Sequence, residues 1–159
     1  MIRVGILTVS TLGAAGERSD GSGDAIAAWA RERGHAVSVR DLVPDDTTAI
    51  AQRLAAWADG GQADLILTTG GTGLAATDRT PEATRAVLER EAPGIAEYLR
   101  TAAVPAFPRA ALSRGIAGVR GAALIVNLPG STSGVKDGLT ALDAVAQHAV
   151  DLLRGETAH

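Results

Sequence analysis

The sequence predicts one α/β domain, with a mostly parallel β-sheet that carries helices on both faces. Apolar segments of strand length alternate along the chain with segments of helical periodicity, an order typical of parallel strands joined by crossover helices. The first strand segment is apolar on both faces, as a buried parallel strand should be. No repeat, linker or low-complexity segment interrupts the chain, so we expect residues 1–159 to form a single domain.

The first quarter of the chain predicts a strand, a loop, a helix and a second strand. Residues 3–10 form the apolar strand, and the small, polar, glycine-rich residues 11–23 predict a loop. Residues 22–33 have a helical apolar face and a charged last turn, followed by Gly34, a typical residue after a helix C-terminus. Residues 36–42 alternate apolar and polar side chains, which predicts a strand at or near an edge of the sheet.

The middle of the chain predicts a helix, a strand and a second helix. Either Asp46 or Thr47 caps a helix that Gly60 and Gly61 end. Residues 64–69 predict the third strand. The order Thr80-Pro81-Glu82 indicates a helix start, with a threonine N-cap, a proline at the first helical position and an acid in the first turn.

The last third of the chain predicts two short helical pieces, one strand and one long helix. Pro93 and Gly94 separate the preceding helix from a helix over residues 95–103. Residues 105–115 predict a short helical segment. The last clear strand covers residues 122–128, and apolar side chains at helical spacing predict one helix over 135–153.

Composition excludes several classes of function. The chain has no cysteine, which excludes a disulfide framework and a thiolate metal site. A net charge of -3 and four scattered aromatic residues argue against a nucleic-acid binder. Lys136 is the single lysine. The apolar segment 4–9 is too short for a signal sequence or a membrane span, so we expect a cytoplasmic protein.

Familiar catalytic motifs are missing from the sequence. It contains no G-x-G-x-x-G, no P-loop and no G-x-S-x-G motif, which disfavours dinucleotide oxidoreductases, P-loop NTPases and serine hydrolases. The first strand ends in Ser10-Thr11 instead of an acidic pair, which disfavours a response-regulator receiver. The three histidines, at 35, 148 and 159, lie too far apart in sequence for a zinc or triad spacing.

A glycine-rich loop follows the third strand and is the strongest functional signal. Ligands of open α/β sheets bind at the carboxyl ends of the strands, where the segment 69–73 (Thr-Gly-Gly-Thr-Gly) lies. Glycines let the backbone turn tightly, so that successive N–H groups can hold a phosphate, and the hydroxyls of Thr69 and Thr72 add donors. The alternative is an ordinary strand-to-helix turn.

Two acids lie in loops at the same end of the predicted sheet. Asp78 follows the glycine loop, and Asp45 follows the second strand. A carboxylate beside a phosphate repels it unless a cation lies between them, and Mg²⁺ commonly bridges the two. Surface or turn positions are the alternative for each acid taken alone.

Two further loops at strand ends carry polar side chains. Asp20 and Ser22 open the first long helix, where free N–H groups attract anions, although either side chain could simply cap the helix. Asn127 ends the last strand, and its amide could read the edge of a heterocycle. The alternative for the segment 127–131 is an ordinary turn.

The sequence resembles the molybdopterin-binding family, which includes bacterial molybdopterin adenylyltransferases and the G domain of gephyrin. Residues 68–73 (Thr-Thr-Gly-Gly-Thr-Gly) followed by 78–83 (Asp-Arg-Thr-Pro-Glu-Ala) match the family's central motif. Weaker matches in the right order cover nearly the whole chain; they are Val9-Ser10, Asp20-Gly21-Ser22-Gly23, Val43-Pro44-Asp45, Leu112-Ser113-Arg114 and Asn127-Leu128-Pro129-Gly130-Ser131.

The resemblance implies a three-layer α/β/α fold and a role in molybdenum cofactor biosynthesis. The implied reaction is Mg-ATP-dependent adenylylation of molybdopterin, with pyrophosphate released, by a homotrimer or homohexamer. The molybdenum insertion protein is a candidate partner. Asp45 and Asp78 match the family's catalytic, magnesium-holding acids. Residues implied to bind substrate are Gly70, Gly71, Thr72, Gly73, Asp20, Ser22, Ser113, Asn127, Pro129, Gly130 and Ser131.

Two positions depart from the family's pattern. Thr11 stands where relatives often carry an acid, and Gly21 stands where they often carry arginine. These departures keep open the alternative of a protein that binds molybdopterin without adenylylating it. A related domain that hydrolyses a nucleotide-type pyrophosphate is a further alternative.

Overall fold

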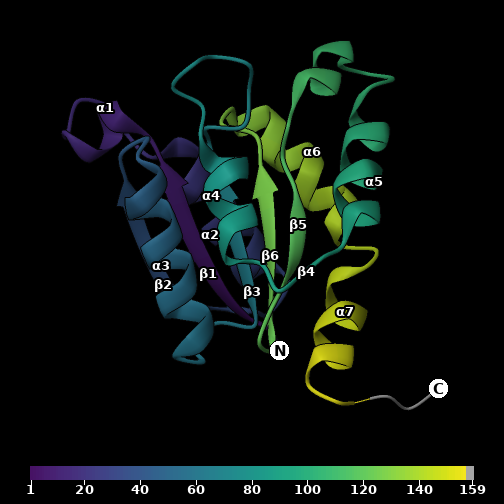
Figure 1. Ribbon diagram of the computed structural model, residues 1–159. Helices are drawn as coiled ribbons and strands as arrows, with labels where there is room; N and C mark the ends of the chain where they lie inside the picture. Colours follow the sequence, from purple (N-terminus) through teal and green to yellow (C-terminus); the bar gives the residue numbers. More distant parts are fainter. Residues whose placement is uncertain (157–159) are drawn as a thin grey trace.

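A computed structural model describes residues 1–156 and has three layers, with one six-stranded sheet between two layers of helices (Figure 1). The strand order is β2-β1-β3-β6-β5-β4. The strands are β1 (Arg3–Val9), β2 (Ala36–Val43), β3 (Leu65–Thr69), β4 (Arg90–Glu91), β5 (Ala117–Arg120) and β6 (Ala123–Leu128). The helices are α1 (Thr11–Ala14), α2 (Gly21–Glu32), α3 (Thr47–Asp59), α4 (Thr80–Val87), α5 (Pro93–Ala103), α6 (Thr132–Leu142), α7 (Ala146–Leu153) and the 3₁₀ helix η1 (Pro108–Leu112).

The four strands β2, β1, β3 and β6 are parallel, which confirms the predicted α/β class. β5 pairs antiparallel with β6, and β4 pairs antiparallel with β5, so the sheet is mixed. β2 is an edge strand, as its alternating pattern predicts. Because four parallel strands end at the same edge of the sheet, the loops that follow them lie close together.

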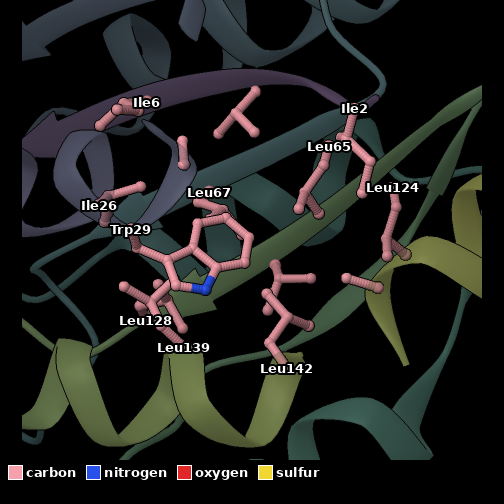
Figure 2. Close-up of a cluster of buried hydrophobic side chains, with 14 of the residues drawn as sticks. Ile2, Ile6, Ile26, Trp29, Leu65, Leu67, Leu124, Leu128, Leu139 and Leu142 are labelled. Carbon is pink, nitrogen blue, oxygen red and sulfur yellow. The ribbon is translucent and has the colours of Figure 1, made fainter. Parts of the chain in front are cut away.

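Side chains of opposite strand faces form two separate cores. On one face, Ile2, Val4 and Ile6 pack with helices α2, α5, α6 and α7. Figure 2 shows Trp29 of α2 between the sheet and α6, near Leu139. On the other face, Leu7 and Val9 pack with α3 and α4; among the residues that pack there are Ile50, Leu54 and Trp57.

Helix ends follow the predicted signals in most places. Asp46 caps α3 by accepting a hydrogen bond from the Thr48 N–H at 3.0 Å, and Asp20 caps α2 in the same way through Gly23 at 3.1 Å. Gly34 follows α2 with a φ of 72°, the left-handed conformation that favours glycine at this position.

The structure corrects the predicted elements at four places. The segment 11–23 is not a continuous loop, because Ser10 caps the short helix α1. Thr80 is not the cap of α4, since Arg79 holds that position. The sequence does not predict the strands β4 and β5, because β4 is two residues long and exposed and β5 contains a glycine.

The fourth correction concerns the predicted helix over 135–153, which is two helices. The helix is interrupted at residues 143–145, where Asp143 accepts hydrogen bonds from the Trp29 Nε1–H at 2.9 Å and from the Arg33 guanidinium at 2.7 Å. These tertiary contacts tie the turn between α6 and α7 to α2 and to the residue that follows it. In the part of the chain that the structure describes, no helix has the length and apolar character needed to cross a membrane.

Candidate active site

Two pockets lie at the carboxyl ends of the parallel strands. The polar pocket has a volume of about 520 Å³, and its polar side chains are those of Thr8, Ser10, Arg18, Ser19, Asp20, Ser22, Asp45, Thr69, Asp78, Ser131 and Thr132. The apolar pocket has a volume of about 360 Å³ and lies against α5 and α6; its apolar side chains include Ala96, Leu99, Ala103, Phe107, Leu112 and Leu128.

The two pockets share a wall. Gly71, Asp78, Gly130 and Ser131 line both of them, and we call these four residues the shared wall. The loops that carry them are in contact, since a Cβ on Gly130 would lie 3.3 Å from the Cα of Gly70. A ligand in one pocket and a ligand in the other would therefore meet at this glycine-rich wall.

The glycine loop after β3 has a backbone that a side chain would disrupt. Gly70 and Gly71 have φ values of 98° and 68°. A Cβ on Gly70 would lie 2.3 Å from the carbonyl oxygen of Val9, and a Cβ on Gly71 would lie 2.3 Å from Thr80 Oγ1. Thr80 instead donates its hydroxyl to the Gly70 carbonyl oxygen at 2.9 Å. The threonine that the sequence predicts as a helix cap thus fixes the loop.

Asp78 belongs to the same loop and lines both pockets. Its carboxylate accepts a hydrogen bond from the Ala75 N–H at 3.1 Å. A Cβ on Gly73 would lie 2.8 Å from Asp78 Oδ2, so the glycine makes room for the carboxylate.

Arg114 connects this loop to the segment before β5. Its guanidinium donates to the carbonyl oxygens of Gly73 at 2.8 Å and Asp78 at 2.9 Å. The same guanidinium forms a two-pronged ion pair with Glu82 at 2.8 and 3.0 Å. The hydrogen bond from Arg114 lowers the pKa of the Glu82 carboxyl, and the bond to Glu82 raises the pKa of Arg114.

Asp45 lies in the polar pocket together with Asp78. Its Oδ2 accepts hydrogen bonds from the Thr11 hydroxyl at 2.9 Å and from the Thr11 N–H at 3.2 Å. The Asp45 N–H donates to Thr11 Oγ1 at 3.1 Å. Thr11 therefore acts as a hydrogen-bonding partner that orients Asp45.

The chemistry of this donor set fits Mg²⁺. Among residues 1–156, no three acidic or histidine side chains come together as a complete metal site. Mg²⁺ needs no such cage, since it usually takes one or two carboxylates and completes its shell with water and substrate phosphates. Asp45 and Asp78, which line one pocket, could supply that number of carboxylates.

Asp20 and Ser22 also lie in the polar pocket. The Asp20 carboxylate is held by its own helix, by the Thr8 hydroxyl at 2.9 Å and by Arg40 at 2.9 Å. The hydrogen bond to Asp20 is the main reason that the pKa of Arg40 is raised. Arg18, a residue that the sequence did not single out, is the one cation among the side chains that line this pocket.

Asn127 lies in the apolar pocket, but its amide is engaged within the protein. Both amide hydrogens are committed, one to Thr68 Oγ1 at 2.9 Å and one to Thr84 Oγ1 at 3.0 Å. Its carbonyl oxygen accepts from the Ile116 N–H at 3.1 Å. Asn127 therefore ties β6 to β3, α4 and the residue before β5, and it has no amide hydrogen left for a heterocycle.

The remaining predicted residues divide between the pockets. Thr72, Gly73, Ser113 and Pro129 line the apolar pocket, and Gly70 lines the polar one. Two of the serines make local bonds. Ser131 caps α6 through the Gly134 N–H at 3.1 Å, and Ser113 accepts from the Gly115 N–H at 3.2 Å. All the predicted site residues thus lie around the two pockets.

Four polar or aromatic residues that line the apolar pocket are not marked by the sequence analysis. Phe107 and Arg109 lie on its rim, with the Arg109 guanidinium 5.2 Å from the centre of the Phe107 ring. Arg100 and Asp137 line it from α5 and α6. No loop motif marks these positions. Arg100 and Asp137 lie on α5 and α6, and Phe107 and Arg109 lie at the start of η1 and within it, so only tertiary packing brings them to the site.

Comparisons with known proteins find relatives along most of the chain. A family model described as a probable molybdopterin binding domain matches residues 5–147. The chain is 36% identical over 156 residues to the molybdopterin adenylyltransferase of Helicobacter pylori strain J99, covering 97% of this chain and 89% of that protein. It is 44% identical over 115 residues to the molybdenum cofactor synthesis protein cinnamon of Drosophila melanogaster, which covers 72% of this chain but 19% of that longer protein.

A solved structure is similar along the whole chain. The molybdopterin biosynthesis enzyme MoaB of Thermus thermophilus superposes with a TM-score of 0.92 at 52% sequence identity, covering 98% of each chain.

Proposed function

This chain belongs to the molybdopterin-binding domain family, and from that premise we propose that it is a molybdopterin adenylyltransferase of molybdenum cofactor biosynthesis. It transfers the adenylyl group of ATP to the terminal phosphate of molybdopterin and releases pyrophosphate. The observation that carries the proposal is the shared wall, which lets two substrates in neighbouring pockets meet at one glycine-rich loop.

The character of each pocket supports one assignment of the substrates. The apolar pocket suits the flat pterin ring system, whose burial is favoured by apolar side chains such as Leu99 and Leu128. The polar pocket, with its hydroxyls and Arg18, suits the ribose and phosphates of ATP. In this arrangement the phosphate of molybdopterin and the α-phosphate of ATP lie at the shared wall.

The reaction needs positioning and charge neutralisation more than acid–base chemistry. An oxygen of the molybdopterin phosphate attacks the α-phosphorus of ATP, and the bond from that phosphorus to the pyrophosphate oxygen breaks. Backbone N–H groups of Gly71, Thr72 and Gly73 hold phosphate oxygens without a P-loop lysine, whereas the Gly70 N–H donates to the Leu128 carbonyl oxygen at 3.3 Å. Asp45 and Asp78 would hold Mg²⁺, which supplies positive charge to the phosphates when bound.

The adenylylation assay tests the proposal directly. Purified protein is incubated with molybdopterin and Mg-ATP, and adenylyl-molybdopterin and pyrophosphate are quantified. Molybdopterin binding without product identifies a binding protein instead, and nucleotide hydrolysis without any pterin identifies a pyrophosphatase. Either result contradicts the proposal.

Substitution of the two acids tests their roles. Asp78→Asn and Asp45→Asn each remove one negative charge from the polar pocket while keeping the shape of the side chain. We expect adenylylation to fall by about 100-fold or more, with molybdopterin affinity nearly intact. The matched control is Asp151→Asn on α7, which lines neither pocket and should keep full activity. Full activity of Asp78→Asn would remove that residue from the mechanism.

Assembly and location are also part of the proposal. We expect a homotrimer or homohexamer in the cytoplasm, with the molybdenum insertion protein as the partner that takes the product. An apolar hollow over the start of α5, lined by Pro93, Ile95, Tyr98 and Val145, offers a surface for subunit contact. Light scattering should give three or six times the 16.1 kDa of the chain.

A further inference from the structure

The apolar pocket has few polar side chains, and the protein itself engages most of them. The two amide hydrogens of Asn127 are committed, and Arg100 donates to the carbonyl oxygens of Ser113 at 3.3 Å and Gly115 at 2.7 Å. Asp78 accepts from a backbone N–H. Within residues 1–156, Asp137 is the carboxylate of this pocket that makes no hydrogen bond.

Asp137 lies on α6 at a distance from the shared wall. The helix begins after Ser131, which belongs to that wall, and Asp137 follows six residues later. At 1.5 Å per residue, the two positions are about 9 Å apart along the helix axis. Gly134, three residues before Asp137, lies beside it on the helix surface and also lines the pocket, so no side chain stands between the carboxylate and the start of the helix at this position.

This separation matches the shape of molybdopterin, whose phosphate and pterin amino group lie at opposite ends of the molecule. With the phosphate at the shared wall, the pyrimidine edge of the pterin extends along α6. That edge presents two adjacent donors, the ring N3–H and the 2-amino group. A carboxylate accepts from both at once, as it does from a guanidinium.

We infer that the Asp137 carboxylate recognises the pyrimidine edge of the pterin ring, an inference that rests on the proposed function. The same carboxylate discriminates against adenine, whose hydrogen-bonding edges alternate donors and acceptors and leave one carboxylate oxygen facing an acceptor. Asp137 therefore determines which of the two substrates occupies the apolar pocket.

The test compares pterin with lumazine, in which an oxygen replaces the 2-amino group. Binding of each compound to the full chain is measured by fluorescence titration, for the wild type, Asp137→Asn and Glu97→Gln. The control Glu97 is an exposed carboxylate of α5 that lines neither pocket. The KM values for molybdopterin and for ATP are measured on the same proteins.

The wild type and Glu97→Gln should bind pterin about tenfold more tightly than lumazine, because lumazine lacks one charge-assisted donor. Asp137→Asn should lose this preference. Its KM for molybdopterin should rise about tenfold, while its KM for ATP stays unchanged.

Two outcomes overturn the inference. One is a wild-type chain that does not bind pterin in preference to lumazine, and the other is an Asp137→Asn chain that keeps the preference. Failure of the proposed function would give a different result, because the wild type would then form no adenylyl-molybdopterin in the assay. The titrations would still show whether Asp137 recognises the pterin.

Discussion

At the scale of single residues, one arginine holds the backbone of the glycine loop that carries Asp78. Arg114 reaches two carbonyl oxygens of the loop and the carboxylate of Glu82 on α4. The Asp78 carboxylate owes its place to this loop, whose backbone Arg114 connects to the segment before β5. Arg114 is thus a positioning residue, which acts on substrates through Asp78.

Substitution of Arg114 should slow catalysis more than it weakens binding. Arg114→Ala is expected to lower kcat by about tenfold to 100-fold, because small displacements of a catalytic group have effects of that size. Guanidinium added to the buffer should restore part of the activity. Arg31→Ala, at an exposed arginine of α2, serves as the control and should neither lose activity nor respond to guanidinium. A kcat unchanged in Arg114→Ala would contradict the positioning role.

Gly71 offers a second prediction at this scale. Gly71→Ala places a Cβ 2.3 Å from Thr80 Oγ1 and also strains a backbone with a φ of 68°. Gly34→Ala is a matched control, because Gly34 has a φ of 72° and nothing within 4 Å of its Cβ position. Both should lose about 1 kcal/mol from strain, measured by urea unfolding. Gly71→Ala should lose more free energy of unfolding than the control and should also lose adenylylation activity. An equal loss of stability in the two variants would show that the contact with Thr80 is unimportant.

Site residues can be predicted from the sequence where they belong to a local motif. They cannot be predicted where only tertiary packing brings them to the site. Asp45, Asp78 and the glycines follow strands, so their common location can be deduced from the rule for parallel sheets. The internal bonding of Asn127 could not be predicted, because its partners come from β3, from α4 and from the residue before β5. Asp137 lies on a helix surface without any motif.

At the scale of elements, the antiparallel edge of the sheet shows how packing overrides a weak local signal. β5 is short and contains Gly118, and β4 has two residues. Gly118 lies against the backbone of β4, where a Cβ would be 2.4 Å from the carbonyl oxygen of Arg90. The absence of a side chain allows this pairing, and single-sequence patterns give no indication of such a contact. The strands of the parallel half, by contrast, carry local patterns from which they can be predicted.

Gly118→Ala should therefore detach β4 from the edge of the sheet. The substitution leaves the parallel strands untouched, so the fold should persist with a loss of about 1–3 kcal/mol in the free energy of unfolding. Hydrogen exchange of the Glu89 and Ala92 amides, which donate to Val119 and Ala117, should become faster. Gly94→Ala, where nothing lies within 4 Å of the Cβ position, should leave these amides protected. Unchanged protection in Gly118→Ala would show that the strand tolerates a methyl group.

At the scale of the whole molecule, the pockets and the main buried ion-pair cluster lie at opposite ends of the sheet. Figure 1 shows the N-terminus and α7 at the end away from the loop between β3 and α4. There the buried Asp64 accepts hydrogen bonds from the guanidinium groups of Arg3 at 2.9 Å and Arg154 at 2.7 Å. Burial alone would raise the pKa of the Asp64 carboxyl, but the bonds from both arginines outweigh it and lower the pKa to about 2.

This cluster predicts how stability depends on pH. The folded-state pKa of about 2 lies below the ordinary value of 3.8, so the unfolded chain takes up a proton first as the pH falls. The ionised Asp64 carboxylate adds about 2 kcal/mol to the free energy of unfolding. This contribution is complete above about pH 4 and is lost between pH 4 and 2. The unfolding temperature of the wild type should therefore fall as the pH is lowered from 4 to 2.

Asp64→Asn should be less stable at pH 7 and should show a flatter profile between pH 4 and 2, because the group that titrates there is gone. Its KM values at pH 7 should equal those of the wild type, since the cluster lies far from the pockets. An unchanged slope in Asp64→Asn would assign the acid sensitivity to other carboxylates.

The shared wall has a consequence for ligand design. A synthetic compound that links a pterin to an adenosine through a phosphate chain would place one half in each pocket, because only glycines, a serine and Asp78 separate them. Once one half is bound, the other is held next to its own pocket at a high effective concentration. Such a chimeric inhibitor should bind far more tightly than either half, and shortening or lengthening its linker would measure the span of the wall.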